Sequence, residues 1–169
     1  MTAAEANHEI VLTWLNDAYN VENALAHVLE RHAKAATGFP DMGAKLEEHL
    51  TQTRRHAELV AGRITALGSA PSTHKDHWTS VFAPLENLFT GSADEESLLK
   101  NSITDYASEN FEIATYRAII TAAQDTGDTD TVHVCEQILG DEQAMARFLD
   151  ERMPALVDRI VRQAMSASS

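Results

Sequence analysis

The stretches YNVENAL (residues 19–25) and SENFEIATY (residues 108–116) decide the fold of this chain. Each lies within a run whose apolar residues recur every three or four positions, which is the spacing of an amphipathic helix. Each also places a glutamate, Glu22 or Glu112, beside the apolar face. A carboxylate inside a protein core costs free energy unless a partner replaces its water. The two stretches therefore predict helices whose buried acids need such a partner.

The same apolar spacing extends over four long segments. It predicts helices over about residues 4–36, 41–67, 94–125 and 129–152. Gly38 and Pro40 separate the first two segments, and TGDTD (residues 126–130) is the expected turn between the last two. Residues 69–93 are expected to form a crossover that contains a short helix. Pro154 is expected to begin a separate C-terminal helix over residues 154–165, followed by a tail over residues 166–169.

This order of elements predicts one all-α domain over residues 1–169. Two antiparallel helical hairpins joined by one long connection make up a ferritin-like four-helix bundle. A helix of about 27 residues is roughly 40 Å long, and the segment 69–93 can return over that distance. We therefore expect a ferritin-like bundle whose core covers about residues 4–152.

Composition excludes several classes of function. The chain has 26 acidic and 13 basic residues and a formal charge of −13, which disfavours nucleic acid and anionic membranes as partners. No apolar run approaches the roughly 18 residues of a membrane span, and the first residues do not resemble a leader, so we expect a soluble, cytoplasmic protein. Cys135 is the single cysteine and is expected to be a buried thiol.

The spacing of the two hairpins places several acids at one height. In an antiparallel helix pair, residues equidistant from the turn lie level. This rule pairs Glu112 with Glu142, and Glu22 with Gln52, each pair being 30 residues apart. All four positions lie about 15 residues from their turns. The hairpins therefore read as an internal repeat with its polar positions near the middle of the bundle.

Other metal-ligating side chains lie near these positions. On the second helix, His49, Gln52, Thr53 and His56 fall within an arc of about 100°. Glu109 lies one turn before Glu112 on the third helix. Carboxylates and imidazoles that converge inside a bundle are the ligands that a pair of Fe or Mn ions requires. Metal would then solvate the buried acids.

The chain resembles the bacterial YciE/YciF family of ferritin-like, rubrerythrin-related stress proteins over about residues 9–152. Four segments at the family's spacings carry the resemblance: LNDAYNVENAL, KLEEHLTQTRRHAELV, YASENFEIATYRAI and ILGDEQA. The resemblance implies a helical bundle, a di-metal centre and expression linked to stress. It implies as metal ligands Glu22, His56, Glu109, Glu112 and Glu142, with His49 as a sixth candidate and Gln52 as a donor behind the ligands.

The chain also departs from the ferritin-like pattern, which has Glu-x-x-His on the second and fourth helices. Here Thr53 stands three residues before His56, and Met145 stands three residues after Glu142. Two hypotheses therefore remain open. The protein is either a di-iron or di-manganese oxidoreductase that reacts with O₂ or peroxide, or a metal-poor, non-catalytic acidic bundle that acts by self-association or partner binding.

The sequence also leads to expectations about the oligomeric state, iron storage and the remaining histidines. The chain is expected to form a homo-oligomer, most simply a dimer. Iron storage in a cage is a third and weaker alternative, because it requires a specific assembly surface. The other six histidines share no common face and are expected at the surface: His8, His27, His32, His74, His77 and His133.

Overall fold

The computed structural model describes residues 3–36, 38–72 and 95–167, with side chains from residue 8 onward. Four helices and no strand occur in these ranges. They are α1 (Ala3–Ala35), α2 (Pro40–Ala66), α4 (Glu95–Thr126) and α5 (Thr129–Ala167). The predicted all-α fold is confirmed, and the expected helix starts lie within one residue of the observed ones. Most of the expected crossover, including its short helix, lies outside the described residues.

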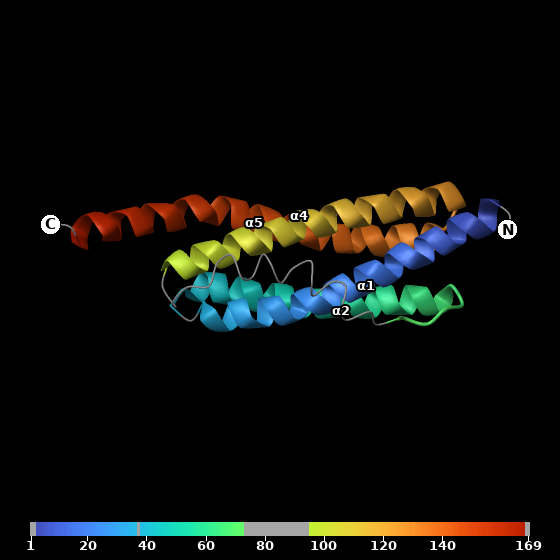
Figure 1. Ribbon diagram of the computed structural model, residues 1–169, viewed down its shortest axis with the longest axis horizontal. Helices are drawn as coiled ribbons and strands as arrows, with labels where there is room; N and C mark the ends of the chain where they lie inside the picture. Colours follow the sequence, from blue (N-terminus) through green and yellow to red (C-terminus); the bar gives the residue numbers. More distant parts are fainter. Residues whose placement is uncertain (1–2, 37, 73–94, 168–169) are drawn as a thin grey trace.

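The helices form two antiparallel hairpins, α1 with α2 and α4 with α5, which pack side by side along their length (Figure 1). The N-terminal end of α1 and the C-terminal end of α5 lie at opposite ends of the bundle. Among the described helices, none is long and apolar enough to cross a membrane. The arrangement brings residues far apart in sequence to the same height within the bundle.

Glycines in a left-handed conformation end two of the helices. Gly68 has a φ of 83° and Gly127 a φ of 72°, a region that side chains with a Cβ rarely adopt. After α4, the Gly127 amide donates to Gln124 and the Asp128 amide to Ala123, so the last carbonyls of the helix are satisfied. This tight ending lets the chain reverse and begin α5 two residues later.

Asp128 then caps the start of α5. Its Oδ1 accepts from the Thr131 amide at 3.0 Å and from the Arg63 guanidinium on α2 at 2.8 Å. Arg63 also donates through Nε to Thr131 Oγ1 at 2.7 Å. The cap therefore ties the α4–α5 turn to the end of α2. The start of α2 has no such side-chain cap, because Phe39 occupies the N-cap position and Pro40 follows it.

The helix expected to begin at Pro154 is a continuation of α5, so the predicted boundary there is wrong. α5 runs unbroken from Thr129 to Ala167 with Pro154 inside it. Proline removes the hydrogen bond to the carbonyl of Asp150. Both Pro154 and Asp150 are exposed, so water can reach the freed carbonyl. The helix therefore continues and projects past the other helices at that end of the bundle (Figure 1).

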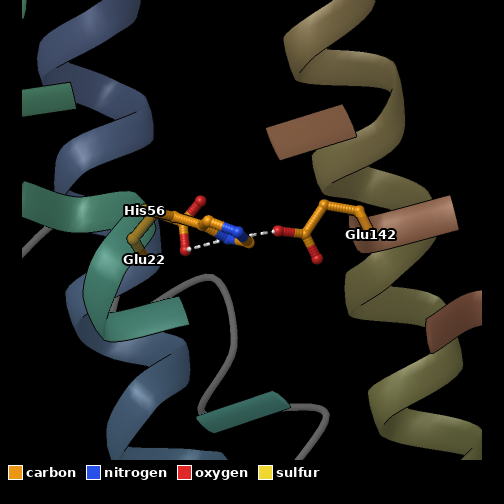
Figure 2. A group of neighbouring side chains, drawn as sticks. All are labelled: Glu22, His56 and Glu142. Atoms are coloured by element: carbon orange, nitrogen blue, oxygen red, sulfur yellow. Dashed lines mark ion pairs between the residues drawn. The ribbon is translucent and has the colours of Figure 1, made fainter. Parts of the chain in front are cut away.

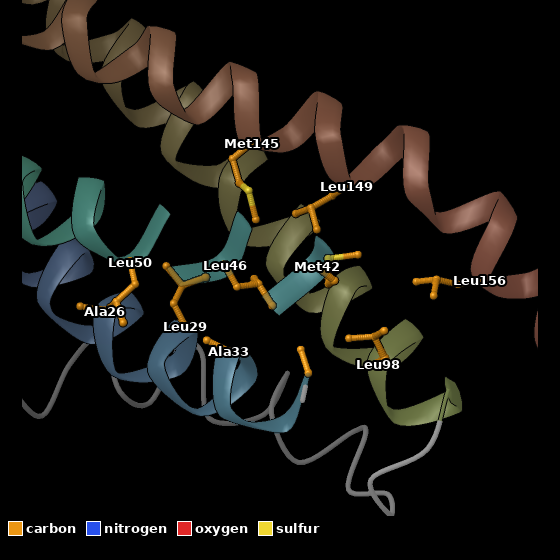
Figure 3. Packing of buried hydrophobic residues seen from close by; sticks show 11 residues of the cluster. Ala26, Leu29, Ala33, Met42, Leu46, Leu50, Leu98, Met145, Leu149 and Leu156 are labelled. Atoms are coloured by element: carbon orange, nitrogen blue, oxygen red, sulfur yellow. The ribbon is translucent and has the colours of Figure 1, made fainter. Parts of the chain in front are cut away.

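The interior has three tiers. One apolar cluster lies toward the α1–α2 turn and includes Leu29, Leu46 and Leu149 (Figure 3). A second apolar cluster lies toward the α4–α5 turn and includes Leu15, Ile64, Ile119, Ile138 and Cys135. Cys135 is fully buried, as expected from the sequence. Between the two clusters, buried histidines and glutamates from all four helices replace the apolar side chains.

Candidate metal centre

Five of these buried side chains form two groups that could each hold a metal ion. Glu22 from α1, His56 from α2 and Glu142 from α5 make the first group (Figure 2). His49 from α2, Glu109 from α4 and the same Glu142 make the second. In each group, one ligand atom per residue lies within 4.8 Å of the others. All four helices contribute, and Glu142 belongs to both groups.

The two oxygens of Glu142 face different imidazoles. His56 Nδ1 lies 2.8 Å from Glu142 Oε1 and 3.7 Å from Glu22 Oε2. His49 Nε2 lies 3.4 Å from Glu142 Oε2 and 3.0 Å from Glu109 Oε1. One carboxylate thus spans the space between the two groups. A carboxylate in this position could provide a ligand to an ion in each group.

The atoms that face one another in the two groups are close but not aligned as hydrogen bonds. Within the described residues, no hydrogen-bond partner exists for Glu22 Oε2, His49 Nε2, His56 Nδ1 or either oxygen of Glu142. Each of these four residues is at most 1% exposed, so bulk water does not satisfy them. Buried polar atoms normally have partners. The atoms converge on shared points instead of pairing with one another.

Each imidazole is fixed by a hydrogen bond at its other nitrogen. His49 Nδ1 lies 3.2 Å from Gln52 Oε1, and His56 Nε2 lies 3.0 Å from Asp141 Oδ2. Because both partners accept through oxygen, the outer nitrogens carry the protons that they donate. When these imidazoles are neutral, as metal ligands must be, their inner nitrogens present lone pairs toward the centre. Tyr116 also donates its hydroxyl to Glu22 Oε1 at 2.5 Å.

The family of the chain follows from comparison with known families. The model of a domain of unknown function, DUF892, matches residues 6–162. The chain belongs to the DUF892 family. The expected resemblance to the YciE/YciF proteins is also confirmed, because the structure of the Escherichia coli stress protein YciF superposes with a TM-score of 0.80. That structure is 19% identical and aligns over 94% of this chain and 99% of its own.

Two further solved structures place this DUF892 chain among ferritin-like bundles. A protein from Xanthomonas campestris is 26% identical, covers 95% of this chain and 99% of its own, and has a TM-score of 0.79. A bacterioferritin from Desulfovibrio desulfuricans, described by its diiron site, is 23% identical with a TM-score of 0.70. It covers 94% of this chain and 86% of its own. The fold of the DUF892 chain is therefore a ferritin-like four-helix bundle.

The six residues predicted as ligands do not all enter the two groups. Glu22, His49, His56, Glu109 and Glu142 do, whereas Glu112 belongs to neither group. Glu112 is nonetheless buried, and its carboxyl interacts electrostatically with Glu142, Glu22 and Glu109. It therefore lies beside the centre as an additional acid.

The two departures from Glu-x-x-His have clear structural roles. Thr53 is buried and donates its hydroxyl to the His49 carbonyl at 3.0 Å, so its side chain is occupied by the backbone of its own helix. Met145 packs in the apolar cluster beside Leu46 and Leu149 (Figure 3). The second imidazole of the centre is His49, on the same helix as His56. In this DUF892 chain α2 thus supplies both nitrogens, and α5 supplies none to the two groups.

Burial and close charges shift the pKa values in the centre in opposite directions. Burial raises the pKa of Glu22 to about 6, and it raises the pKa of Glu112 well above its usual range, with help from the charge of Glu142. Burial opposes ionisation of Glu142 too, but contacts with His49 and His56 outweigh it and hold the pKa of Glu142 well below its usual range. Burial likewise lowers the pKa of His56, yet the carboxylates of Glu142 and Glu22 raise it to about 10. Without metal, the centre keeps Glu142 ionised beside a protonated His56.

Sequence reasoning missed Asp141 and placed His32 wrongly. Asp141 had a usable signal, because it is an acid directly beside Glu142. The Tyr116 hydroxyl reaches Glu22 on another helix. His32 was expected at the surface but is 8% exposed, and its Nδ1 lies 2.7 Å from Oδ1 of Asp105 on α4. These contacts join different helices, and spacing along one helix does not contain them.

Proposed function

We propose that this protein binds two Fe or Mn ions in the centre and reacts there with O₂ or peroxide. One observation carries the proposal: buried nitrogen and carboxylate oxygen atoms converge without hydrogen-bond partners around both ends of Glu142. Leaving such atoms unpaired in a dry core costs about 1 to 3 kcal/mol each, and more where they are charged. Metal coordination is the interaction that satisfies all of them at once.

The charge of the centre matches two divalent ions. Four buried carboxylates surround it, from Glu22, Glu109, Glu112 and Glu142, and together they carry four negative charges when ionised. Two neutral imidazoles add nitrogen ligands without adding charge. Two divalent cations carry four positive charges, so the loaded centre would be neutral. Mixed carboxylate and imidazole ligands suit iron and manganese.

The residues around the centre have separate roles in this proposal. Glu142 would contribute a ligand to both ions, while Gln52 and Asp141 fix the tautomers of the imidazoles. Tyr116 keeps its proton, because burial raises its pKa well above the usual range, and it orients the Glu22 carboxylate through that proton. When bound, a pair of Fe or Mn ions would supply the electrons that reduce the oxidant.

We extend the proposal to stress protection and to self-association. The similar Escherichia coli structure is described as a stress protein, which supports a role of the same kind here. Val157 and Val161 are 42% and 50% exposed and stand one turn apart in the C-terminal part of α5. Exposed apolar side chains on one helix face favour a homo-oligomer, most simply a dimer.

Elemental analysis of protein purified without chelator or metal-affinity tag tests the proposal. We expect up to two Fe or Mn per chain, and after reconstitution with Fe²⁺ we expect peroxide to oxidise the bound iron. The control is the same protein dialysed against chelator, which should lose both the metal and the reaction. Protein that binds neither ion at micromolar concentrations would overturn the proposal.

A second candidate is a metal-poor, non-catalytic acidic bundle. It is favoured by Thr53 and Met145, which stand where the ferritin-like pattern has ligands, and by the close approach of His56 to Glu142 at 2.8 Å. In that case the histidines alone would compensate the buried acids. The metal content would then be near zero, and replacing one acid would leave the protein as stable as before or more stable.

A further inference from the structure

The buried centre needs a route by which ions reach it, and the bundle has two outer grooves to compare. The α1–α2 groove has a volume of about 320 Å³ and is lined by Tyr19, Glu22, Asn23, Arg54, Ala57 and Glu58, among others. The α4–α5 groove has a volume of about 400 Å³ and is lined by Tyr106, Asn110, Ile113, Arg117, Ala146 and Arg147, among others. The two grooves lie on the two hairpins, at similar heights.

The mouths of the two grooves are built alike. Asn23 is exposed and donates its side-chain amide to the Tyr19 carbonyl at 2.6 Å. Asn110 is exposed and donates in the same way to the Tyr106 carbonyl at 2.7 Å. Each groove also has a buried alanine in its wall, Ala57 or Ala146, and each of these is 7% exposed. Because the two mouths are similar, a change in one groove can be compared with the equivalent change in the other as a control.

The floors of the two grooves differ. The α1–α2 groove reaches Glu22, a member of the first candidate metal group, and Glu22 Oε2 is buried without a hydrogen-bond partner. The α4–α5 groove reaches Ile113, which is 9% exposed, and no member of either group lines it. Only the first of these two grooves therefore ends on a ligand of the centre.

The charged side chains that line the two grooves also differ, and they favour the α1–α2 groove as the one that attracts cations. In the α1–α2 groove, Arg54 is paired with Glu30 at 3.1 Å, and Glu58 offers a carboxylate at the surface. Asn23 adds a side-chain carbonyl oxygen, since its amide nitrogen is used by Tyr19. The α4–α5 groove is lined by two arginines and one aspartate. A divalent cation is attracted by carboxylates and carbonyl oxygens and repelled by guanidinium groups.

We propose that the α1–α2 groove is the route by which divalent cations reach the centre, with Glu58 and Asn23 at its mouth and Glu22 at its floor. This proposal rests on the proposed function, because it assumes that the centre takes up metal. Glu22 would be the first buried ligand that an incoming ion meets. Ala57 lines the groove beside Glu22 and obstructs it little, because it has no side chain beyond Cβ. The second ion position, at His49 and Glu109, would fill by way of the first.

A thiol placed at either mouth allows the route to be closed after the protein has folded. Asn23→Cys and Asn110→Cys each remove one equivalent hydrogen bond and present an exposed cysteine. Cys135 does not interfere, because it is fully buried and burial raises the pKa of its thiol to about 12. Each variant is reacted with a polyethylene-glycol maleimide. Stopped-flow absorbance with Co²⁺ then gives the uptake rate, and release to EDTA gives the exit rate.

We expect labelled Asn23→Cys to take up and release Co²⁺ at least about tenfold more slowly than its unlabelled form, as closure of a diffusional route would require. The number of ions bound at equilibrium should not change. Labelled Asn110→Cys should stay within about twofold of its unlabelled form. Equal rates before and after labelling at Asn23, or equal slowing at both positions, would overturn the route. No Co²⁺ uptake by any unlabelled protein would instead overturn the proposed function itself.

Three more variants test the route independently, without a label. Ala57→Leu fills the wall of the α1–α2 groove, and Ala146→Leu is its counterpart in the other groove. We expect slower Co²⁺ uptake for Ala57→Leu alone, with equilibrium affinity preserved. Glu58→Gln should slow uptake by about twofold to tenfold at low ionic strength, an effect that salt should remove. An unchanged uptake rate in both Ala57→Leu and Glu58→Gln would contradict the route.

Discussion

The two hairpins repeat the same backbone plan but carry different chemistry. The α1–α2 hairpin contributes one acid and both imidazoles to the candidate metal groups. The α4–α5 hairpin contributes two acids to those groups, and Glu112 beside them. The α1–α2 hairpin has both imidazoles but lacks Glu142, whereas the α4–α5 hairpin has Glu142 but adds no imidazole to the two groups. The centre therefore exists only where the two hairpins meet, and any ion bound there ties them together.

The largest expected effect comes from removing the carboxylate that serves both groups. Glu142→Ala should lower the metal content from two ions per chain to none, because each group loses an oxygen ligand and the remaining charge no longer balances two dications. Metal analysis after equilibrium dialysis measures this loss. Glu136→Ala, an exposed position on the same helix, is the control and should keep both ions. Two ions retained in Glu142→Ala would show that Glu142 does not hold them.

The next effect concerns the stability that metal adds across the hairpin interface. At free metal one hundred times its dissociation constant, binding one ion stabilises the fold by about 2.7 kcal/mol. For a chain of this size, that corresponds to a rise in melting temperature of roughly 5 to 10 °C. Thermal unfolding followed by circular dichroism, with Mn²⁺ and with chelator, measures the rise. Identical melting curves would mean that metal does not join the hairpins.

A smaller gain in stability should follow from removing Glu112, the acid outside the two groups. Without metal, Glu112→Gln should stabilise the protein by about 1 to 3 kcal/mol, because it removes a buried ionisable carboxyl that lies among other acids. Urea unfolding of the chelator-treated protein tests this expectation. Glu151→Gln, at an exposed position, should change stability by less than about 0.5 kcal/mol. A loss of stability in Glu112→Gln would show that Glu112 makes a favourable contact in the metal-free protein.

The smallest expected effect is the pH-dependent stability that Asp128 contributes as the cap at the α4–α5 turn. Burial would raise the pKa of Asp128, but hydrogen bonds from Thr131 and the neighbouring Arg63 outweigh it and lower that pKa below its ordinary value of 3.8. An acid with a depressed pKa stabilises the fold above its unfolded-state pKa, and this contribution is lost as pH falls through the folded-state pKa. Asp128→Ala should therefore cost about 1 kcal/mol at pH 7.

The difference between parent and Asp128→Ala should shrink below about pH 3.8, because the parent then loses its ionised cap as well. Thermal unfolding at pH 7 and pH 3 measures both values. The α1–α2 turn is the internal control, since the start of α2 has no side-chain cap to titrate. If the difference in stability stays constant with pH, then the negative charge of Asp128 does not contribute to the stability of the fold.

Much of the fold could be predicted because strong local signals set the helix ends. Gly38, Pro40 and Gly127 interrupt the apolar spacing, and the four helices begin within one residue of the expected positions. Pro154 misled the prediction, because an exposed position tolerates a proline inside a helix. The spacing within each hairpin also predicted where along the bundle the centre lies. Residues equidistant from a turn lie side by side, and this does not depend on the other contacts of the helices.

It was harder to predict which residues form the site than to predict where along the bundle the site lies. Level pairing places Glu112 and Glu142 together but does not say how each helix is rotated about its axis. Glu109 belongs to one candidate metal group, whereas Glu112 belongs to neither. The partners behind the ligands, Asp141 and Tyr116, contact residues on other helices. Such contacts depend on packing between hairpins, which one sequence does not encode at a fixed spacing.

The division of the ligands between the hairpins also sets an order of events during synthesis. The ribosome makes the chain from its N-terminus, so His49 and His56 emerge well before Glu142. Glu142 follows His56 by 142 − 56 = 86 residues, which at about 5 to 20 residues per second is a delay of roughly 4 to 17 seconds. During that interval the nascent α1–α2 hairpin offers two imidazoles and one acid without the bridging carboxylate. If the centre binds two ions as proposed, their retention would have to wait until translation has passed α5, and metal insertion would be a late step in the maturation of the protein.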